Sequence, residues 1–186
     1  MRIISGTKRG LRLVAAKGAA VRPTTDSVKE LIFDVLGKAV VHGRVLDLYA
    51  GTGALGIEAL SRGSARAVFV ENSRAALRAI QENLKKAGFE DRAEILRLSA
   101  LHGVKMLANL NERFDIILAD PPYRAGLAEK TLVAVENADL VARGGWVVLE
   151  QRVDSSAGAV QIRYGLHTRK RRGDTEIFFY RYDADT

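Results

Sequence analysis

The chain has 186 residues, of which 47% are hydrophobic and 27% are charged. This size and composition are ordinary for one globular domain, and no apolar run approaches the roughly 20 residues that cross a bilayer. The absence of cysteine excludes disulfides, thiolate metal sites and pyrimidine C5 methylation, which requires a cysteine nucleophile. The first residues lack the apolar core of a signal peptide, so we expect a cytoplasmic protein.

Basic residues outnumber acidic ones by 29 to 22, which gives a net charge of +7. They gather near both ends of the chain, since residues 1–21 hold no acidic residue and residues 169–172 are all basic. Either cluster alone could be a solvated face, but two of them favour a nucleic-acid surface. The candidate RNA-binding residues are Arg2, Lys8, Arg9, Arg12, Arg22, Arg169, Lys170, Arg171 and Arg172.

The expected elements begin with two short strands over residues 2–14, joined by a basic turn. A helix should follow from Ser27, which forms a capping box with Glu30, and should end at Gly37. From there on, strands and helices alternate. Strands are expected over 45–49, 67–71, 93–98, 114–119 and 145–150, and helices over 54–61, 74–87, 101–109 and 127–136.

The tail of the chain differs, because residues 159–166 and 175–182 predict two strands with no helix between them. The alternation before the tail predicts an α/β, Rossmann-like fold with a seven-stranded, mostly parallel sheet. The last two strands should form an antiparallel hairpin that closes this sheet. We expect a small N-terminal β-hairpin extension over residues 1–22 and one main domain over residues 23–186.

A glycine-rich loop follows the first strand of the alternating pattern. Gly51, Gly53 and Gly56 match the dinucleotide-binding fingerprint, and Glu71 ends the next strand, where an acid can bind both ribose hydroxyls. This pattern alone leaves both a nicotinamide dinucleotide and S-adenosylmethionine open. Asp47, just before the loop, favours S-adenosylmethionine, because a carboxylate suits an ammonium group and repels a pyrophosphate.

The fourth strand ends in Asp120-Pro121-Pro122-Tyr123, after an apolar run that is typical of a buried parallel strand. Proline cannot continue a ladder of backbone hydrogen bonds, so the strand should stop there. Asp120 and Tyr123 are therefore expected at the carboxyl edge of the sheet, where open α/β folds bind their ligands.

These motifs, together with Arg22-Pro23-Thr24-Thr25-Asp26, resemble the RsmD family of bacterial 16S rRNA guanine-N2 methyltransferases. The resemblance covers essentially the whole chain. Asp-Pro-Pro-Tyr alone is shared by enzymes that methylate DNA adenine, RNA guanine or protein glutamine, and the Arg-Pro-Thr-Thr-Asp stretch narrows the choice.

The resemblance implies a class I methyltransferase fold that uses S-adenosyl-L-methionine, releases S-adenosyl-L-homocysteine and needs no metal. It implies 16S rRNA as the partner, presented to a monomeric enzyme in an assembled 30S subunit or a late precursor. Asp120 and the Pro121 carbonyl would accept the two amino hydrogens of the base, and Tyr123 would stack on it. The implied cofactor-binding residues are Asp47, Ala50, Gly51, Gly53, Glu71, Ser99 and Ala100, with Ser99 standing where the family commonly carries an acidic or amide residue.

Three alternatives stay open at this point. The first is an amino-group methyltransferase for DNA adenine or protein glutamine. The second is a nucleotide-binding dehydrogenase that uses the same glycine loop. The third is a non-catalytic RNA-binding module, which would not need Asp120. The three histidines, His42, His102 and His167, match no metal-ligand spacing.

Overall fold

The computed structural model describes residues 1–16, 25–122, 126–153 and 162–182. Seven strands form one sheet in the order β3-β2-β1-β4-β5-β7-β6. The strands are β1 (Arg44–Leu48), β2 (Arg66–Val70), β3 (Ala93–Leu96), β4 (Phe114–Ala119), β5 (Val141–Arg152), β6 (Gly165–Arg172) and β7 (Thr175–Arg181). The helices are α1 (Asp26–Leu36), η1 (Gly37–Val40), α2 (Ala54–Ser61), α3 (Arg74–Ala87), η2 (Glu90–Arg92), α4 (Ala100–Asn109) and α5 (Leu127–Asn137).

The predicted sheet is confirmed in its main features. β3, β2, β1, β4 and β5 pair in parallel, and β7 pairs antiparallel with both β5 and β6. Because two antiparallel pairings follow one another, β6 points in the same direction as the parallel strands. The last strand pair is thus a hairpin whose turn lies at the carboxyl edge of the sheet.

Several predicted boundaries were wrong. The N-cap of α1 is Thr25, whose hydroxyl accepts a hydrogen bond from the Val28 amide, and not Ser27. The strand expected over 159–166 begins only at Gly165, and residues 159–161 lie outside the described part. β6 carries the basic run instead, as a charged edge strand exposed at nearly every position, so it shows no alternation of buried and exposed residues.

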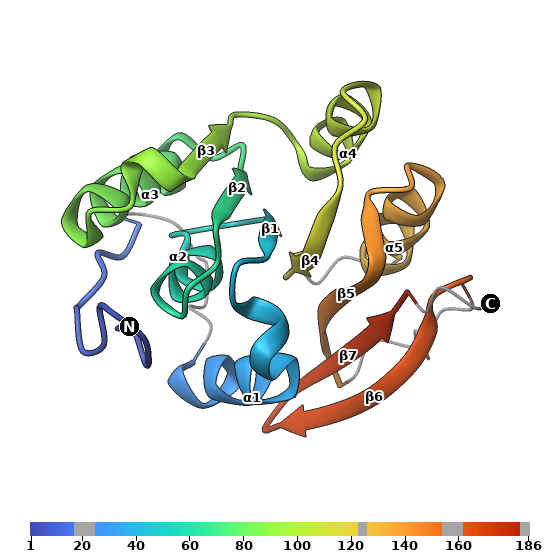
Figure 1. Cartoon of the computed structure of the whole chain (residues 1–186), viewed down its shortest axis with the longest axis horizontal. Coiled ribbons are helices and arrows are strands. Elements are labelled where there is room, and N and C mark those ends of the chain that lie inside the picture. Colours follow the sequence, from blue (N-terminus) through green and yellow to red (C-terminus); the bar gives the residue numbers. More distant parts are fainter. Residues whose placement is uncertain (17–24, 123–125, 154–161, 183–186) are drawn as a thin grey trace.

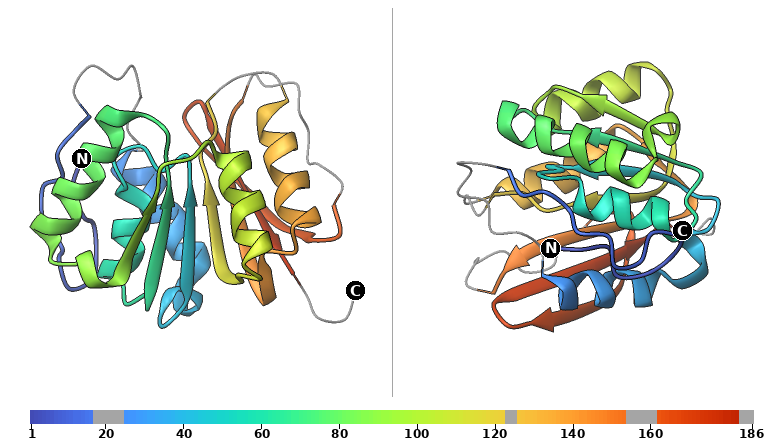
Figure 2. Two further views of the ribbon diagram at one scale, coloured as in Figure 1. Left: turned by 90° about the horizontal axis from the view of Figure 1, so that it is seen from above. Right: turned by 90° about the vertical axis from the view of Figure 1, so that its left-hand side faces the viewer.

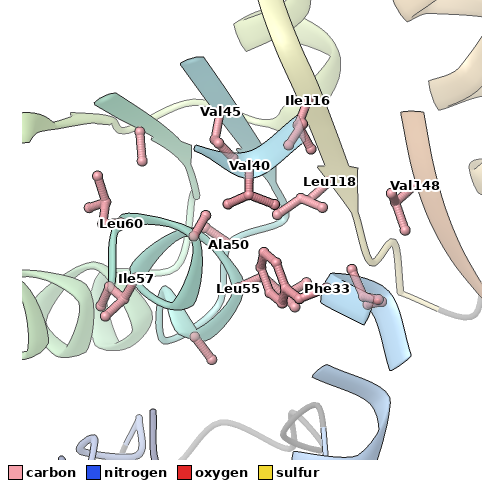
Figure 3. Close-up of a cluster of buried hydrophobic side chains, with 14 of the residues drawn as sticks. Phe33, Val40, Val45, Ala50, Leu55, Ile57, Leu60, Ile116, Leu118 and Val148 are labelled. Carbon is pink, nitrogen blue, oxygen red and sulfur yellow. The ribbon is translucent and has the colours of Figure 1, made fainter. Parts of the chain in front are cut away.

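Helices cover both faces of the sheet, giving three layers. In Figure 1 the strands run as a diagonal row, with α4 and α5 on the upper right and α1 and α2 on the lower left. Figure 3 shows one core cluster, where Phe33 of α1 and Leu55 of α2 approach Leu118 of β4 and Val148 of β5. None of the described helices is long and apolar enough to cross a membrane.

The first residues of the chain form an arm beside α2 and α3 (Figure 2). The two strands expected over residues 2–14 are reduced to one antiparallel bridge, between Arg2 and Arg12. Ile3 and Leu13 of the arm are buried in the same core cluster as α1 and α2. The predicted boundary between an extension and a main domain, at residue 22, lies outside the described residues.

The arm is also tied to the helices by buried polar side chains. The Glu58 carboxylate in α2 accepts the backbone amides of Ile4 and Ser5, at 2.7 and 3.0 Å. The Asn83 side chain in α3 accepts the Val14 amide and donates to the carbonyls of Val14 and Thr52. Asn83 therefore links the arm to the glycine-rich loop.

Candidate active site

The sheet has a topological switch point between its neighbouring strands β1 and β4. From β1 the chain continues outward to β2 and β3, and from β4 it continues in the opposite direction to β5. Ligands of open α/β sheets bind at the carboxyl ends of the strands at such a point. The glycine loop after β1 and Asp120 after β4 both lie there, which is the placement that the sequence predicted.

The glycine loop owes its shape to left-handed backbone conformations. Gly51 and Gly53 have φ angles of 56° and 77°, and Gly53 is the N-cap of α2. Gly56 has a different role, because a Cβ atom there would lie 2.3 Å from the Phe69 ring. Gly56 thus lets α2 pack closely on the sheet, whereas Gly51 and Gly53 make the turn.

Tyr49 is an unexpected part of this loop. It has a φ angle of 60°, a conformation that a non-glycine residue seldom adopts. Its hydroxyl lies 2.7 Å from the Thr131 hydroxyl in α5. This hydrogen bond connects the loop to the helix on the other face of the sheet, and so it fixes the direction in which the chain leaves β1.

Glu71, directly after β2, already holds the loop in place. One carboxylate oxygen accepts the Gly51 amide at 2.8 Å, and the other accepts the amides of Asn72 and Ser73, both at 2.8 Å. An ionised carboxylate offers about four lone-pair sites, so acceptor capacity is left for hydroxyl groups of a ligand. Glu71 therefore anchors the loop and keeps free acceptor capacity, and its ribose-binding role stays a prediction.

Asp47 in β1 is buried, with 3% of its surface exposed, and accepts the Gly56 amide at 2.9 Å. Burial raises the pKa of this carboxyl to about 7, the hydrogen bond from Gly56 opposes the rise, and the charges of Asp120 and Glu71 add to it. A cationic ligand nearby would favour the ionised form of Asp47. An ammonium group fits this environment, whereas a pyrophosphate would be repelled.

Asp120 follows the last residue of β4, and burial raises its pKa to about 6. Pro121 is buried and Pro122 is exposed, so the chain turns outward after the strand. Tyr123, the expected stacking residue, lies outside the described residues, as does Arg22.

Sequence reasoning missed Glu150 of β5. Only 4% of this residue is exposed, and its Oε1 atom is buried without a hydrogen-bond donor among the described residues. Burial, followed by repulsion from Asp120 and Asp47, raises its pKa well above the usual range. The sequence does contain a pattern that could have indicated this residue, because Glu150 follows an apolar run just as Asp120 does.

Asp47, Asp120 and Glu150 belong to one face of the sheet. Side chains of a strand alternate between its two faces. Leu118 and Val148, two residues before Asp120 and Glu150, both pack in the core cluster beneath α1 and α2. The bond from Asp47 to the amide of Gly56 places its carboxylate beneath α2 as well. Three neighbouring strands, β1, β4 and β5, thus each bring one acid to the same face.

Ser99 and Ala100 after β3 and Ala50 after β1, all expected to bind the cofactor, lie at the same edge of the sheet. The contacts seen for them are within the protein itself. Ser99 is the N-cap of α4, and its hydroxyl also lies 2.7 Å from Nδ1 of His102. Ala100 begins that helix and is buried. Ala50 is buried too, and its amide donates to the Val70 carbonyl at 3.1 Å. The roles of these three residues toward a cofactor stay predictions.

The family model described as Conserved hypothetical protein 95 matches residues 1–181. The chain belongs to this family. A relative, the ribosomal RNA small subunit methyltransferase D of Escherichia coli (strain K12), is 34% identical over 99% of this chain and 91% of its own length. The solved structure of yhhF from Escherichia coli has a TM-score of 0.85 at 32% identity, covering 100% of this chain and 99% of that one.

More distant structures share the fold of the Conserved hypothetical protein 95 family. An RNA methyltransferase from Salinibacter ruber, solved in complex with S-adenosyl-L-homocysteine, matches with a TM-score of 0.67 at 15% identity, over 89% of this chain and 96% of that one. Together with the strand order, these neighbours confirm the predicted Rossmann-like, class I methyltransferase fold.

The two basic clusters of this family member lie in different places. The arm reaches Ser61 at the C-terminal end of α2, where the amides of Thr7 and Lys8 are bound, so Lys8 lies at the amino edge of the sheet. β6 instead ends at the carboxyl edge, because Arg172 and Arg152 both pair with Thr175. The β6 cluster therefore ends at the edge that carries the acids. The arm spans both edges, because the Met1 sulfur, next to Arg2, lies 3.4 Å from the Thr52 hydroxyl of the glycine loop.

Alternation divides the β6 cluster between the two faces of the sheet. Lys170 pairs with Ile177, whose side chain lies in the core beneath α1, so Lys170 and Arg172 share the face of the three acids. Arg169 and Arg171 point to the other face, where Arg169 forms an ion pair with Glu176 at 3.5 Å. Within the described ranges, no group of three or more acidic or histidine side chains is arranged to hold a metal ion.

Proposed function

We propose that this chain is an S-adenosylmethionine-dependent methyltransferase that modifies the exocyclic N2 of a guanine in 16S rRNA, of the position-966 type in standard rRNA numbering. The observation that carries the proposal is the position of Asp120 and Pro121, which leave β4 beside the glycine loop at the switch point. The whole-length similarity to ribosomal RNA small subunit methyltransferase D supports the substrate class.

The chemistry of the edge favours S-adenosylmethionine over a dinucleotide. Four acidic side chains surround the switch point, namely Asp47, Glu71, Asp120 and Glu150. Such a set repels a pyrophosphate and attracts the ammonium and sulfonium groups of the cofactor. Glu71 would hold the ribose hydroxyls and Asp47 would favour the ammonium end. When bound, the cofactor supplies a methyl group that is already activated by the sulfonium.

The chain then has to hold and orient a poor nucleophile. The lone pair of a guanine amino group is delocalised into the ring, so positioning and hydrogen-bond acceptors are what the enzyme can add. The Asp120 carboxylate and the Pro121 carbonyl accept the two amino hydrogens and leave the lone pair free to face the methyl group. As nitrogen becomes tetrahedral and positive, both acceptors bind it more strongly.

The environment of Asp120 also prepares it for the proton that the methylated amine releases. With its pKa raised to about 6 by burial, Asp120 is a stronger base than an ordinary aspartate, yet it is still ionised at neutral pH. Tyr123, from which we expect stacking on the flipped base, completes the predicted set.

The RNA is held around this edge by basic side chains. Lys170 and Arg172 of β6 lie on the face that carries the acids and can bind phosphates beside the target base. In this proposal, an assembled 30S subunit or a late precursor presents the target guanine to a monomeric, cytoplasmic enzyme.

Mass mapping of 16S rRNA from a strain that lacks the protein tests this proposal. One guanine should lose an N2 methyl group, and the purified enzyme with S-adenosylmethionine should restore it on 30S particles more efficiently than on free rRNA. Unchanged rRNA in the deletion strain would overturn the assignment. Thermal shifts with S-adenosylhomocysteine and with NAD provide a second test, and stabilisation by NAD alone would favour the dehydrogenase alternative.

A further inference from the structure

The starting point is the unpaired carboxyl oxygen of Glu150. Nearly all buried polar atoms in proteins have a hydrogen-bond partner. Oε1 of Glu150 is buried and receives no donor from the described residues. The residue is only 4% exposed and lies near the carboxyl end of β5, an interior strand of the sheet. An acceptor in this position indicates a ligand that brings its own hydrogen-bond donor.

The order of the strands indicates which ligand lies closest to Glu150. Across the edge the acids follow one another as Glu71 after β2, Asp47 in β1, Asp120 after β4 and Glu150 in β5. Glu71 and Asp47 adjoin the glycine loop, which is the cofactor half of the edge. Asp120 holds the reacting amine in the proposed function. Glu150 lies on the far side of Asp120 from the cofactor half, and so it faces the target base.

Asp120 and Glu150 are close enough to contact the same base. Neighbouring strands lie about 4.8 Å apart, and the preceding residues Ala119 and Leu149 are paired in register. Both acids belong to the face beneath α1, as the positions of Leu118 and Val148 show. One planar base bound between them can therefore meet both carboxyl groups along one edge.

The bases differ in the hydrogen-bonding group beside their exocyclic amine, so two neighbouring carboxyl groups can distinguish between them. In guanine, the exocyclic amine lies between N1–H, a donor, and N3, an acceptor. In adenine and cytosine, the ring nitrogen next to the exocyclic amine is an acceptor. A second carboxyl acceptor beside Asp120 therefore matches guanine alone.

We propose that Glu150 accepts the N1–H of the target base and thereby selects guanine over other amino-bearing bases. This inference rests on the proposed function, because it requires a guanine amine at Asp120. A hydrogen bond from N1–H favours the charged form of a carboxyl group, so guanine binding offsets the burial of Glu150. A ring nitrogen with a lone pair would be repelled by the ionised carboxylate, so the selection depends on the ionised form that N1–H favours.

Replacing the target guanine by an analogue that lacks N1–H tests its hydrogen bond to Glu150 without changing the protein. Mass mapping first locates the target guanine, and 30S particles are then rebuilt with ligated 16S rRNA that carries guanosine, 2-aminopurine riboside or inosine at that position. 2-Aminopurine keeps the amine but has a lone pair at N1, and inosine lacks the amine and gives the background. Single-turnover methyl transfer by the wild-type enzyme should be at least about tenfold faster on guanine than on 2-aminopurine.

Glu150→Ala then separates the contact from the intrinsic reactivity of the two bases. Transfer to guanine should slow, transfer to 2-aminopurine should stay nearly constant, and the preference should fall by at least about tenfold. Glu150→Gln, which keeps the shape of the side chain, should also reduce the preference. Glu176→Gln is the matched control, because Glu176 lies near the same end of the sheet on the opposite face and should leave the preference unchanged.

The possible outcomes distinguish the two proposals. If the wild-type enzyme transfers no methyl group to guanine, the proposed function fails and this inference fails with it. If guanine is methylated but the preference is the same in the wild type and both Glu150 variants, only the inference is overturned. Calorimetry with S-adenosylhomocysteine gives a further criterion, since a loss of cofactor affinity in Glu150→Gln would assign the carboxyl group to the cofactor ammonium and also overturn the inference.

Discussion

The two halves of the carboxyl edge are built differently. In the half formed by β1 and β2, Glu71 accepts three backbone amides and Asp47 accepts one, so the acids are part of the loop structure. In the half formed by β4 and β5, one oxygen of Glu150 is buried without a donor among the described residues, and burial raises the pKa of Asp120. The first half is thus held by the chain's own hydrogen bonds, whereas the second keeps a buried acceptor without a donor among the described residues.

The largest expected effect is on the half formed by β4 and β5. Asp120→Ala should lower kcat by at least about 10²–10³-fold, because it removes an acceptor that strengthens as the amine becomes positive. The affinity for S-adenosylhomocysteine, measured by calorimetry, should stay within about twofold. Asp91→Ala, which removes an exposed acid at the opposite edge, is the control. Lost cofactor binding in Asp120→Ala would show that the two halves do not divide the work in this way.

In the half formed by β1 and β2, a substitution should weaken cofactor binding and leave kcat nearly unchanged. Glu71→Gln should weaken S-adenosylhomocysteine binding by about 10- to 100-fold, because a charged acceptor for hydroxyl groups and for the Gly51 amide is lost. At saturating cofactor, kcat should change much less. Glu94→Gln in β3 changes an acid whose partner is Arg66, and it should leave the cofactor affinity as it is. A loss of kcat in Glu71→Gln as large as that in Asp120→Ala would contradict this division between the two halves.

The buried acids also make stability depend on pH. The pKa values of Asp47 and Asp120 are about 7 and about 6 in the folded chain, above their ordinary value of 3.8. Between these values the folded chain binds more protons than the unfolded chain, so the free energy of unfolding of the ligand-free protein falls as the pH rises from about 4 to about 7. Urea unfolding at a series of pH values measures this fall, and Asp47→Asn should make it shallower.

The same protons link pH to cofactor binding. A cationic ligand favours the ionised acids, so the affinity for S-adenosylmethionine should rise with pH through about 6 to 7. S-Adenosylhomocysteine lacks the sulfonium charge and should show a weaker rise. Equal pH dependence for the two ligands in calorimetry would mean that the acids respond only to the ammonium group.

The smallest effects concern the RNA surface. Lys170→Ala and Arg172→Ala should each raise the KM for 30S particles a few-fold and lower the salt slope of binding by about one. Arg169→Ala and Arg171→Ala, on the opposite face of the same strand, should change both quantities less, and Lys8→Ala at the far edge should change them least. An equal effect at all five positions would mean that the RNA wraps around the whole molecule.

The sequence predicted most of the fold because its signals are local. Gly37 and Gly88 end helices at the expected positions, and the helix expected over residues 54–61 has those bounds in α2. The start of α1 was misplaced because Thr25 and Ser27 are equally good caps, and only the geometry chose between them. β6 escaped prediction because an edge strand exposed on both faces shows no alternation.

The site was predictable where a motif marks it. The glycine loop, Glu71 and Asp120 stand in recognisable patterns, and the structure brings them to one edge. Glu150 has no such motif, and its significance depends on strand order and register, which place β5 beside β4. The different surroundings of the two basic clusters also depend on long-range pairing, which no local pattern contains.

The N-terminal arm has a consequence for the order in which the protein is made. Ile4 and Ser5 bind Glu58, and Val14 binds Asn83, 69 positions later in the chain. At roughly 5–20 residues per second, ribosomal synthesis releases the arm several seconds before these partners exist. The first residues of the nascent chain therefore wait unpaired, and the glycine loop gains its support from Asn83 only when α3 has emerged.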